Sequence, residues 1–162
     1  MNRFTFIISC TLLLTTNVLH AQKKDDLKKD EITKLIADKN FVFKAQSMMP
    51  SLTAPNRQLT SDYDVKVSPD TVICYLPYFG RAYAAPMDAT KGGIQFTTTK
   101  FEYQQTVRKK GGWDIVIKPQ DNTDTRQLNL SVSEAGYASL QVLSNNRQPI
   151  SFSGYIVQKK VK

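Results

Sequence analysis

The feature that most constrains this chain is a two-residue periodicity of apolar side chains, which begins at Phe41 and continues almost to the C-terminus. Apolar and polar residues alternate in short runs, and Gly, Pro, Asn or Asp residues separate most runs from the next. This alternation is typical of β-strands that have one face in the core and one face in water. Because the connections between runs are short, neighbouring strands are expected to be antiparallel.

About eight strands are expected, in the runs 41–47, 59–67, 71–76, 94–105, 113–117, 128–132, 138–142 and 150–156. The run 94–105 changes phase near Thr99-Lys100, which predicts a bulge or bend there. Lys110-Gly111-Gly112 predicts the turn of a hairpin, and Ser68-Pro69-Asp70 predicts another. The sequence therefore indicates a meandering antiparallel sheet.

Residues 23–39 have a different period and predict one amphipathic helix, in which Leu27, Ile32, Leu35 and Ile36 can share a stripe. The sheet has one apolar face, so it must curl on itself or be covered by this helix. We predict an α+β fold, with the N-terminal helix covering a strongly curved antiparallel sheet. Closure of the sheet into a barrel is the main variant.

The first 21 residues have the three parts of a secretory signal peptide. Arg3 provides a positive start, residues 4–14 form an apolar run, and Ala21 is a small residue at which cleavage can occur. The apolar run is too short for a comfortable membrane span. We expect export to the periplasm or beyond, and not an integral membrane protein. A lipid anchor at Cys10 is the alternative.

Cleavage near Ala21 would leave residues 22–162 as a single β-rich domain. It would also remove the only histidine of the chain, His20, and leave Cys74 as the only cysteine. Such a domain lacks the usual general base and the commonest metal ligand. An oxygen-rich turn at 121–124 could bind calcium, but the EF-hand pattern is absent. We predict a non-enzymatic domain with no cofactor and no metal, in which Cys74 is a buried small hydrophobe.

The charge is basic overall but dispersed along the chain. The 22 Lys and Arg residues outnumber the 14 Asp and Glu residues and give a formal net charge of +8. One cluster, Arg108-Lys109-Lys110, lies at the predicted hairpin turn. Dispersed charge keeps a protein in solution and attracts anionic partners weakly. In an envelope such partners would be lipid head groups or acidic glycans, and we expect no nucleic-acid partner.

The segment Pro77–Pro86 contains the most unusual local chemistry. Tyr78, Phe79 and Tyr83 lie close in sequence to Arg81. Aromatic faces beside a guanidinium can stack on sugar rings or hold an anionic group, and a loop at the end of a curved sheet suits a ligand. We predict that Tyr78, Phe79, Arg81 and Tyr83 bind a ligand. The alternative is that the aromatic residues plug the end of the core and Arg81 pairs with a carbonyl or a carboxylate.

Two other functions stay open. A carboxylate-dependent hydrolase would use Asp62, Asp64, Glu102 or Asp114, and alternation places Asp62 and Asp64 on one face of their strand. It predicts that at least two of these carboxylates converge in a pocket, one of them partly buried with a raised pKa. The other function is a structural or assembly protein of the envelope, which an open edge strand would favour.

Several segments of the chain match motifs of known proteins: Leu76-Pro77-Tyr78-Phe79-Gly80-Arg81-Ala82, Gly93-Ile94-Gln95-Phe96, Gly112-Trp113-Asp114-Ile115, and Arg147 followed by Ile150, Phe152, Gly154 and Ile156. Together they resemble a family of small secreted Bacteroidetes proteins classed as a domain of unknown function, number 4251. The resemblance covers the chain from about residue 40. It implies an exported protein of about this size and supplies no activity or catalytic residues. We expect an exported envelope protein that binds a small molecule, a glycan or a protein partner.

Overall fold

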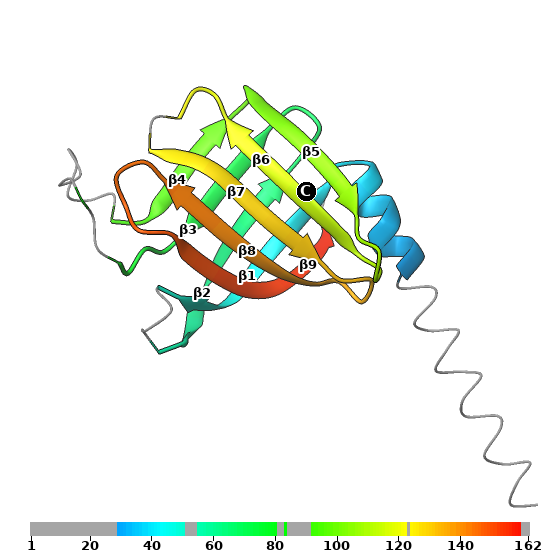
Figure 1. Cartoon of the computed structure of the whole chain (residues 1–162), viewed down its shortest axis with the longest axis horizontal. Coiled ribbons are helices and arrows are strands. Elements are labelled where there is room, and N and C mark those ends of the chain that lie inside the picture. Colours follow the sequence, from blue (N-terminus) through cyan, green and yellow to red (C-terminus); the bar gives the residue numbers. More distant parts are fainter. Residues whose placement is uncertain (1–28, 51–54, 81–82, 84–91, 123, 160–162) are drawn as a thin grey trace, which may run out of the picture.

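The computed structural model describes residues 29–50, 55–80, 83, 92–122 and 124–159. The predicted signal peptide, Cys10 and Arg81 therefore lie outside the described residues. The described part contains one helix, residues 29–37, followed by nine strands (Figure 1). The strands are β1 (Phe41–Met49), β2 (Arg57–Val67), β3 (Val72–Leu76), β4 (Ile94–Thr98), β5 (Phe101–Val107), β6 (Trp113–Pro119), β7 (Thr125–Val132), β8 (Tyr137–Ser144) and β9 (Ile150–Gln158).

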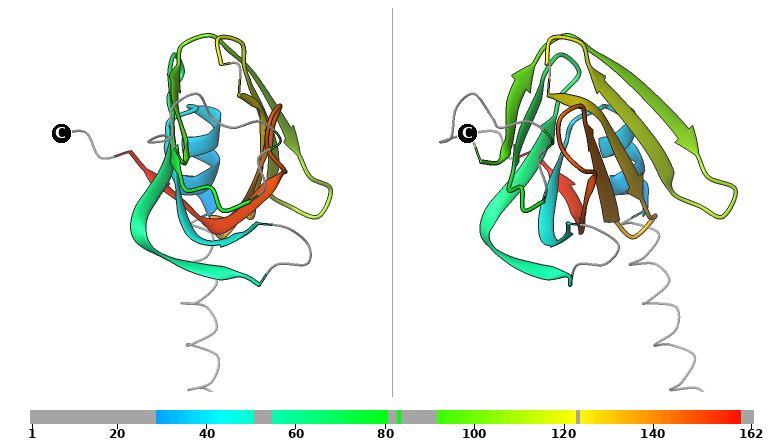
Figure 2. Two further views of the ribbon diagram at one scale, coloured as in Figure 1. Left: turned by 90° about the vertical axis from the view of Figure 1, so that its left-hand side faces the viewer. Right: turned by 60° about the vertical axis from the view of Figure 1, so that its left-hand side comes forward.

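All nine strands form one antiparallel sheet in the order β4-β3-β2-β1-β9-β8-β7-β6-β5. Two meanders, β1 to β4 and β5 to β9, are joined because β1 pairs with both β2 and β9. The sheet curls until it nearly closes into a barrel (Figure 2). The predicted fold class is confirmed, with nine strands where the sequence predicted about eight.

The additional strand comes from the run 94–105, which is two strands. β4 and β5 lie at the two opposite edges of the sheet, and a sharp corner at Thr99 and Lys100 separates them. The Thr98 hydroxyl accepts a hydrogen bond from the Lys100 amide at 3.1 Å, and the Gln120 amide donates to the Lys100 carbonyl at 2.8 Å. The phase change that predicted a bulge or bend therefore marks the corner at which the chain passes from one edge to the other.

The two predicted hairpin turns are present. Ser68 donates its amide to the carbonyl of Thr71 between β2 and β3. Between β5 and β6, Gly111 and Gly112 both have φ of 86°, a conformation that residues with a Cβ rarely adopt. A Cβ on Gly112 would also collide with the carbonyl oxygen of Val132. Glycine is thus required at this turn for its backbone conformation and for its lack of a side chain.

The interior of the barrel is filled with large apolar side chains. Those with almost no exposed surface are Phe41, Phe43, Phe152, Ile36, Met48, Leu76, Ile94, Ile115, Ile117, Leu128, Leu140 and Ile150. The helix contributes Ile32, Leu35 and Ile36 of the predicted stripe to the same core and lies at one end of the barrel (Figure 1), whereas Leu27 lies outside the described residues. Cys74 is buried, and this burial raises the pKa of its thiol.

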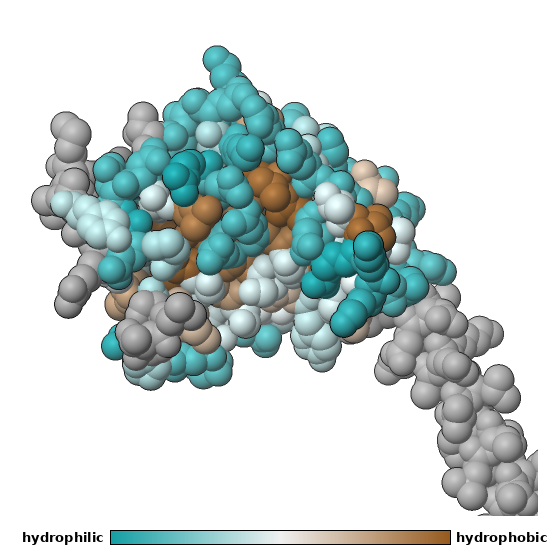
Figure 3. Space-filling view, in the orientation of Figure 1, coloured by the Kyte–Doolittle hydropathy of each residue, from teal (hydrophilic) through white to brown (hydrophobic). Residues whose placement is uncertain are grey.

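The outside of the barrel is largely polar. The face in Figure 3 is mostly hydrophilic, with apolar side chains visible as patches among polar ones. Within the described ranges, no helix is long and apolar enough to cross a membrane. Several aromatic side chains are nevertheless exposed, both on the outer surface and in the loops.

Candidate functional site

Tyr78, the first of the predicted ligand contacts, packs into the loop end of the barrel. Its hydroxyl donates to the carbonyl of Gln148 at 3.2 Å, and the guanidinium of Arg147 lies over its ring, 5.1 Å from the centroid. Burial raises the pKa of the Tyr78 hydroxyl. This position agrees with the alternative prediction, in which the aromatic residues fill the end of the core. The Tyr78 hydroxyl is hydrogen-bonded within the protein.

Arg147 ties three loops together at this end. Its Nε lies 3.2 Å from Asp124 Oδ2, its Nη1 donates to the carbonyl of Gly93 at 3.0 Å, and its side chain is only 11% exposed. The partners come from the segment before β4, the loop before β7 and, through Tyr78, the segment after β3. The predicted candidate site did not include Arg147, because its sequence neighbours do not indicate burial.

Phe79 and Tyr83 remain accessible. Phe79 is 53% exposed, and the guanidinium of Arg57 lies over its ring, 5.6 Å from the centroid. Tyr83 is 70% exposed and is held by its backbone, whose amide donates to the carbonyl of Asn146. Arg81 lies outside the described residues. The structure thus leaves two of the four predicted contact residues facing solvent, and their ligand role stays a prediction.

A second feature lies on the outside of the barrel, where the pairing of β1 with β2 is interrupted. Ala45 pairs with Tyr63, and Ser47 pairs with Gln58, so β2 places residues 59–62 opposite the single residue Gln46. This bulge opens a cavity of about 360 Å³, which we call the β1–β2 hollow. The residues that line it include two with amides, two with hydroxyls, two tyrosines and two with charges: Gln46, Gln58, Thr60, Ser61, Tyr63, Tyr155, Lys44 and Asp62.

Lys44 lines the β1–β2 hollow and contacts two carboxylates. Its Nζ donates to Asp64 Oδ2 at 3.1 Å and lies 3.8 Å from Asp62 Oδ1. The hydrogen bond to Asp64 raises the pKa of the Lys44 ammonium. The Asp64 side chain is only 11% exposed and also lies 3.9 Å from Lys66 Nζ, whereas Asp62 is 97% exposed. Asp62 and Asp64 were predicted to share one face of their strand, and in the structure both belong to one salt-bridge network.

Aromatic rings border the same surface. The rings of Tyr63 and Tyr75 stack, with their centroids 5.6 Å apart and their planes 25° apart. Tyr155 pairs with Lys44 across β9 and β1, and with Tyr137 across β9 and β8. Polar groups and rings thus alternate across neighbouring strands, an arrangement that can combine hydrogen bonds with ring stacking on a ligand.

Comparison with known proteins identifies the family. The profile of the family described as "Domain of unknown function (DUF4251)" matches residues 23–156. The chain belongs to the DUF4251 family. The fold of this DUF4251 domain is similar to the crystal structure of a DUF4251 family protein from Bacteroides eggerthii, with a TM-score of 0.62 and 17% sequence identity over 85% of this chain and 91% of that chain. None of the curated proteins matches this chain significantly.

The other two hydrolase candidates lie elsewhere on the DUF4251 domain. Glu102 on β5 accepts a hydrogen bond from Gln120, and Asp114 on β6 accepts one from the hydroxyl of Ser131 at 2.6 Å. Both strands are far from β2 in the order of the sheet. Of the four candidate carboxylates, only Asp62 and Asp64 are brought together.

The oxygen-rich turn of the DUF4251 domain bonds to its own protein. Asn122 Oδ1 accepts hydrogen bonds from the amides of Asp124 and Thr125, at 2.8 and 2.9 Å. Asp121 accepts from the hydroxyl of Thr98, and Asp124 pairs with Arg147. In the part of the chain that the structure describes, no three His, Cys, Asp or Glu side chains are grouped so that they could hold a metal ion.

Proposed function

We propose that this DUF4251 protein is an exported, non-enzymatic binding module whose ligand is a carbohydrate, held in the β1–β2 hollow. The observation that carries this proposal is the lining of the hollow, which combines amides and hydroxyls with the rings of Tyr63 and Tyr155. A sugar has the same two properties, because its hydroxyls both donate and accept hydrogen bonds and its ring carries apolar C–H faces. Export is supported by the N-terminal segment of the sequence.

The size and polarity of the hollow suit a small ligand. Its volume of about 360 Å³ lies at the lower end of the ordinary range for small-molecule sites, roughly 300–1,000 Å³. The side-chain amides of Gln46 and Gln58 can donate and accept at once, as can the hydroxyls of Thr60 and Ser61. Groups of this kind can bond adjacent sugar hydroxyls without requiring a charge on the ligand.

The charges beside the hollow favour a neutral ligand. Lys44 and Lys66 supply two positive charges, and Asp62 and Asp64 supply two negative charges. The group is therefore balanced and gives no strong field of either sign. The amides and hydroxyls then decide recognition, which favours a neutral glycan over an acidic one.

A binding role has more support than hydrolysis by carboxylates. Hydrolysis of a glycoside needs two carboxyl groups placed on either side of the bond that breaks. Asp62 and Asp64 instead share one partner, the Lys44 ammonium, which lies 3.8 Å from Asp62 Oδ1 and 3.1 Å from Asp64 Oδ2. Glu102 and Asp114 are on other strands and have their own partners. This arrangement supports the proposal that the domain binds its ligand and leaves it unchanged.

The test is a glycan-array screen with the purified protein, followed by calorimetry with the best glycan. Tyr155→Ala and Gln58→Ala should each weaken binding by about tenfold, the factor that corresponds to 1.4 kcal/mol. Gln104→Ala is the matched control for Gln58→Ala, because Gln104 is an exposed glutamine on β5 that does not line the hollow. It should leave the affinity unchanged.

Two results would contradict the proposal in different ways. If Phe79→Ala with Tyr83→Ala abolishes glycan binding while Tyr155→Ala does not, the ligand binds at the loop end and the site is wrong. If no glycan binds at all, the carbohydrate assignment itself is wrong. Circular dichroism of each variant establishes that the barrel is still folded.

A further inference from the structure

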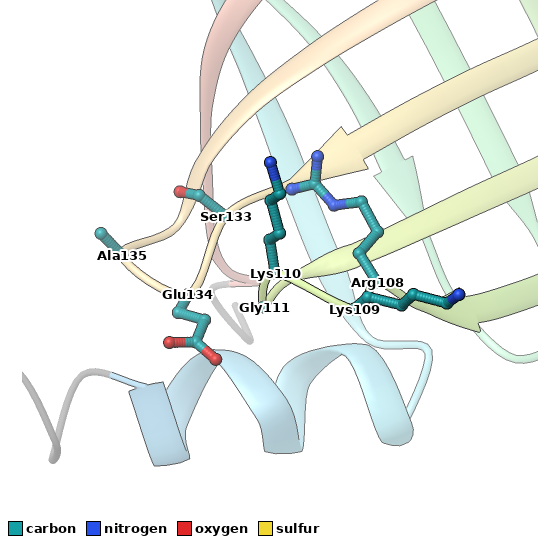
Figure 4. A pocket seen from close by; sticks show the side chains of 7 residues that line it. All are labelled: Arg108, Lys109, Lys110, Gly111, Ser133, Glu134 and Ala135. Atoms are coloured by element: carbon teal, nitrogen blue, oxygen red, sulfur yellow. The ribbon is translucent and has the colours of Figure 1, made fainter.

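A separate hollow lies where two turns meet at the end of the barrel near the helix. Its walls come from Arg108, Lys109, Lys110 and Gly111 of the β5–β6 hairpin and from residues 133–135 of the β7–β8 turn (Figure 4). Its volume is about 560 Å³. It shares no residue with the β1–β2 hollow. We call it the two-turn hollow.

Arg108 is fixed in place by both turns. Its backbone amide donates to the carbonyl of Gly112 at 3.0 Å, and its carbonyl accepts from the amide of Gly111 at 3.1 Å. Its Nη2 donates to the carbonyl of Val132, at the end of β7, at 2.9 Å. The guanidinium is therefore held between the hairpin and the β7–β8 turn before any ligand arrives, which lowers the entropy cost of binding.

The two-turn hollow has an excess of positive charge. Three consecutive cations line it, and among the described residues no carboxylate forms an ion pair with Lys109 or Lys110. Glu134 also lines the hollow, but it pairs with Lys29 at 2.8 Å. Figure 4 shows Glu134 directed toward the helix, whereas the side chains of Arg108 and Lys110 extend together in another direction.

Two polar atoms at this place are buried and have no hydrogen-bond partner within the described part of the protein. They are Arg108 Nε and the hydroxyl oxygen of Ser133. The Asp114 carboxylate lies 3.8 Å from Arg108 Nε, which is beyond hydrogen-bond distance, and its oxygen accepts from Ser131 instead. Buried polar groups without partners are uncommon in folded proteins, because each one loses its bonds to water. Figure 4 shows the Ser133 hydroxyl directed away from Arg108 and Lys110, so an acceptor oxygen of a ligand could satisfy it after Ser133 rotates about its Cα–Cβ bond.

We infer that the two-turn hollow binds a phosphate group. A phosphate carries up to two negative charges, which matches the positive charges of Arg108 and Lys110. It also has acceptor oxygens in several directions, one of which can accept from the hydroxyl of Ser133. The phosphate can belong to a lipid head group or to a soluble phosphate compound, since both present the same oxygens. This site is independent of the proposed carbohydrate site.

The test follows backbone amide signals of the purified protein by nuclear magnetic resonance while inorganic phosphate is added. Signals of residues 108–111 and 133–135 should shift and saturate. Lys110→Gln should weaken binding by about fivefold, since it removes one charge-assisted contact. Lys100→Gln removes the same charge at the opposite end of β5, where Lys100 is exposed, and should leave the affinity unchanged.

Ser133→Ala separates ligand binding from folding. The Ser133 hydroxyl has no hydrogen bond to lose within the described residues, so the melting temperature should not fall. Phosphate affinity should fall by about twofold or more, because an uncharged donor is lost. Signals that do not saturate, or equal weakening by Lys110→Gln and Lys100→Gln, would show unspecific attraction and overturn the site.

A second arm identifies the source of the phosphate. Vesicles of phosphatidylglycerol are mixed with the protein and sedimented, with Lys110→Gln as the variant and Lys100→Gln as the control. Binding that Lys110→Gln abolishes assigns the phosphate to a lipid head group. Binding of inorganic phosphate without vesicle binding assigns it to a soluble compound. The absence of both kinds of binding rejects the proposal.

Discussion

Gly154 of β9 lies so close to the carbonyl oxygen of Lys44 on β1 that no side chain fits between them. The contact falls where β9 pairs with β1, at Ala45↔Gly154, next to the irregularity that follows Ala45. β9 is a strongly curved strand (Figure 1). The absence of a Cβ at Gly154 therefore lets the two meanders pack together at their junction, next to the lysine of the β1–β2 hollow.

Gly154→Ala should destabilise the protein by about 3 kcal/mol, because the added methyl group meets backbone atoms that cannot move independently of β1. Urea denaturation followed by circular dichroism measures the change. Gly92→Ala is the control, since a Cβ there would meet nothing within 4 Å, and it should change stability by less than about 0.5 kcal/mol. Equal stability of both variants would contradict the close packing.

Arg147 is the second position at which a single substitution should weaken the fold. Arg147→Ala removes the ion pair with Asp124 and the hydrogen bond to Gly93, and it uncovers the ring of Tyr78. We expect a loss of about 2 kcal/mol, because the Asp124 carboxylate, whose side chain is 35% exposed, and the half-buried carbonyl of Gly93 lose their donors. Thermal unfolding of Arg147→Ala, compared with Arg126→Ala on the exposed side of β7, measures it. An equal effect of the two variants would show that Arg147 contributes no more than a surface arginine.

Arg147→Lys refines this prediction. Lysine keeps the charge but cannot place separate N–H groups on Asp124 and Gly93 at once. Most of the stability loss should therefore remain in this variant. Full recovery of stability by lysine would mean that charge alone, without the planar guanidinium, holds the loops together.

Alternation predicted which side chains face the core, and inward residues such as Phe43, Val65 and Ile115 are buried as expected. The pattern within one strand stays the same when a neighbouring strand shifts by two residues, so it does not determine which residues lie side by side. The pairing of Tyr155 with Lys44, and of Lys44 with Asp64, therefore could not be predicted.

The sequence pattern did not predict the bulge that forms the β1–β2 hollow, for a related reason. Residues 59–62 are mostly polar, and Leu59 on one side of Ser61 has the same parity as Tyr63, Val65 and Val67 on the other, so the sequence shows no shift of phase there. Arg147 was missed because its partners Asp124, Gly93 and Tyr78 come from distant segments of the chain. Local patterns predicted the fold, whereas contacts between strands and loops created the candidate sites.

Lys44 should contribute more to stability than an ordinary surface lysine. Lys44→Met removes the ammonium that donates to the buried carboxylate of Asp64, and we expect a loss of about 2 kcal/mol. Asp62→Asn is the matched control, because Asp62 is almost fully exposed and lies 3.8 Å from the same nitrogen; it should cost less than about 0.5 kcal/mol. Urea denaturation at neutral pH distinguishes the two. Equal losses would mean that Asp64 does not depend on its hydrogen bond from Lys44.

Tyr103 on β5 gives a prediction about pH. Its hydroxyl is buried and has no hydrogen-bond partner among the described residues, and burial raises its pKa to about 12. An unfolded tyrosine ionises near pH 10. The unfolded state therefore releases this proton first as the pH rises, and the folded state should lose stability between pH 10 and about 12.

Tyr103→Phe should reduce this loss of stability at high pH and should stabilise the protein by about 1 kcal/mol at pH 7, because it removes a polar atom that makes no hydrogen bond. The Lys39 ammonium, 4.8 Å from the ring centroid, can keep its contact with phenylalanine. Urea denaturation at pH 7, 10 and 11.5 measures both effects, and Tyr83→Phe, whose ring is exposed, is the control. If Tyr103→Phe and the original protein lose stability equally above pH 10, the Tyr103 hydroxyl is reaching water or an acceptor in the folded state, and its burial does not govern the response to base.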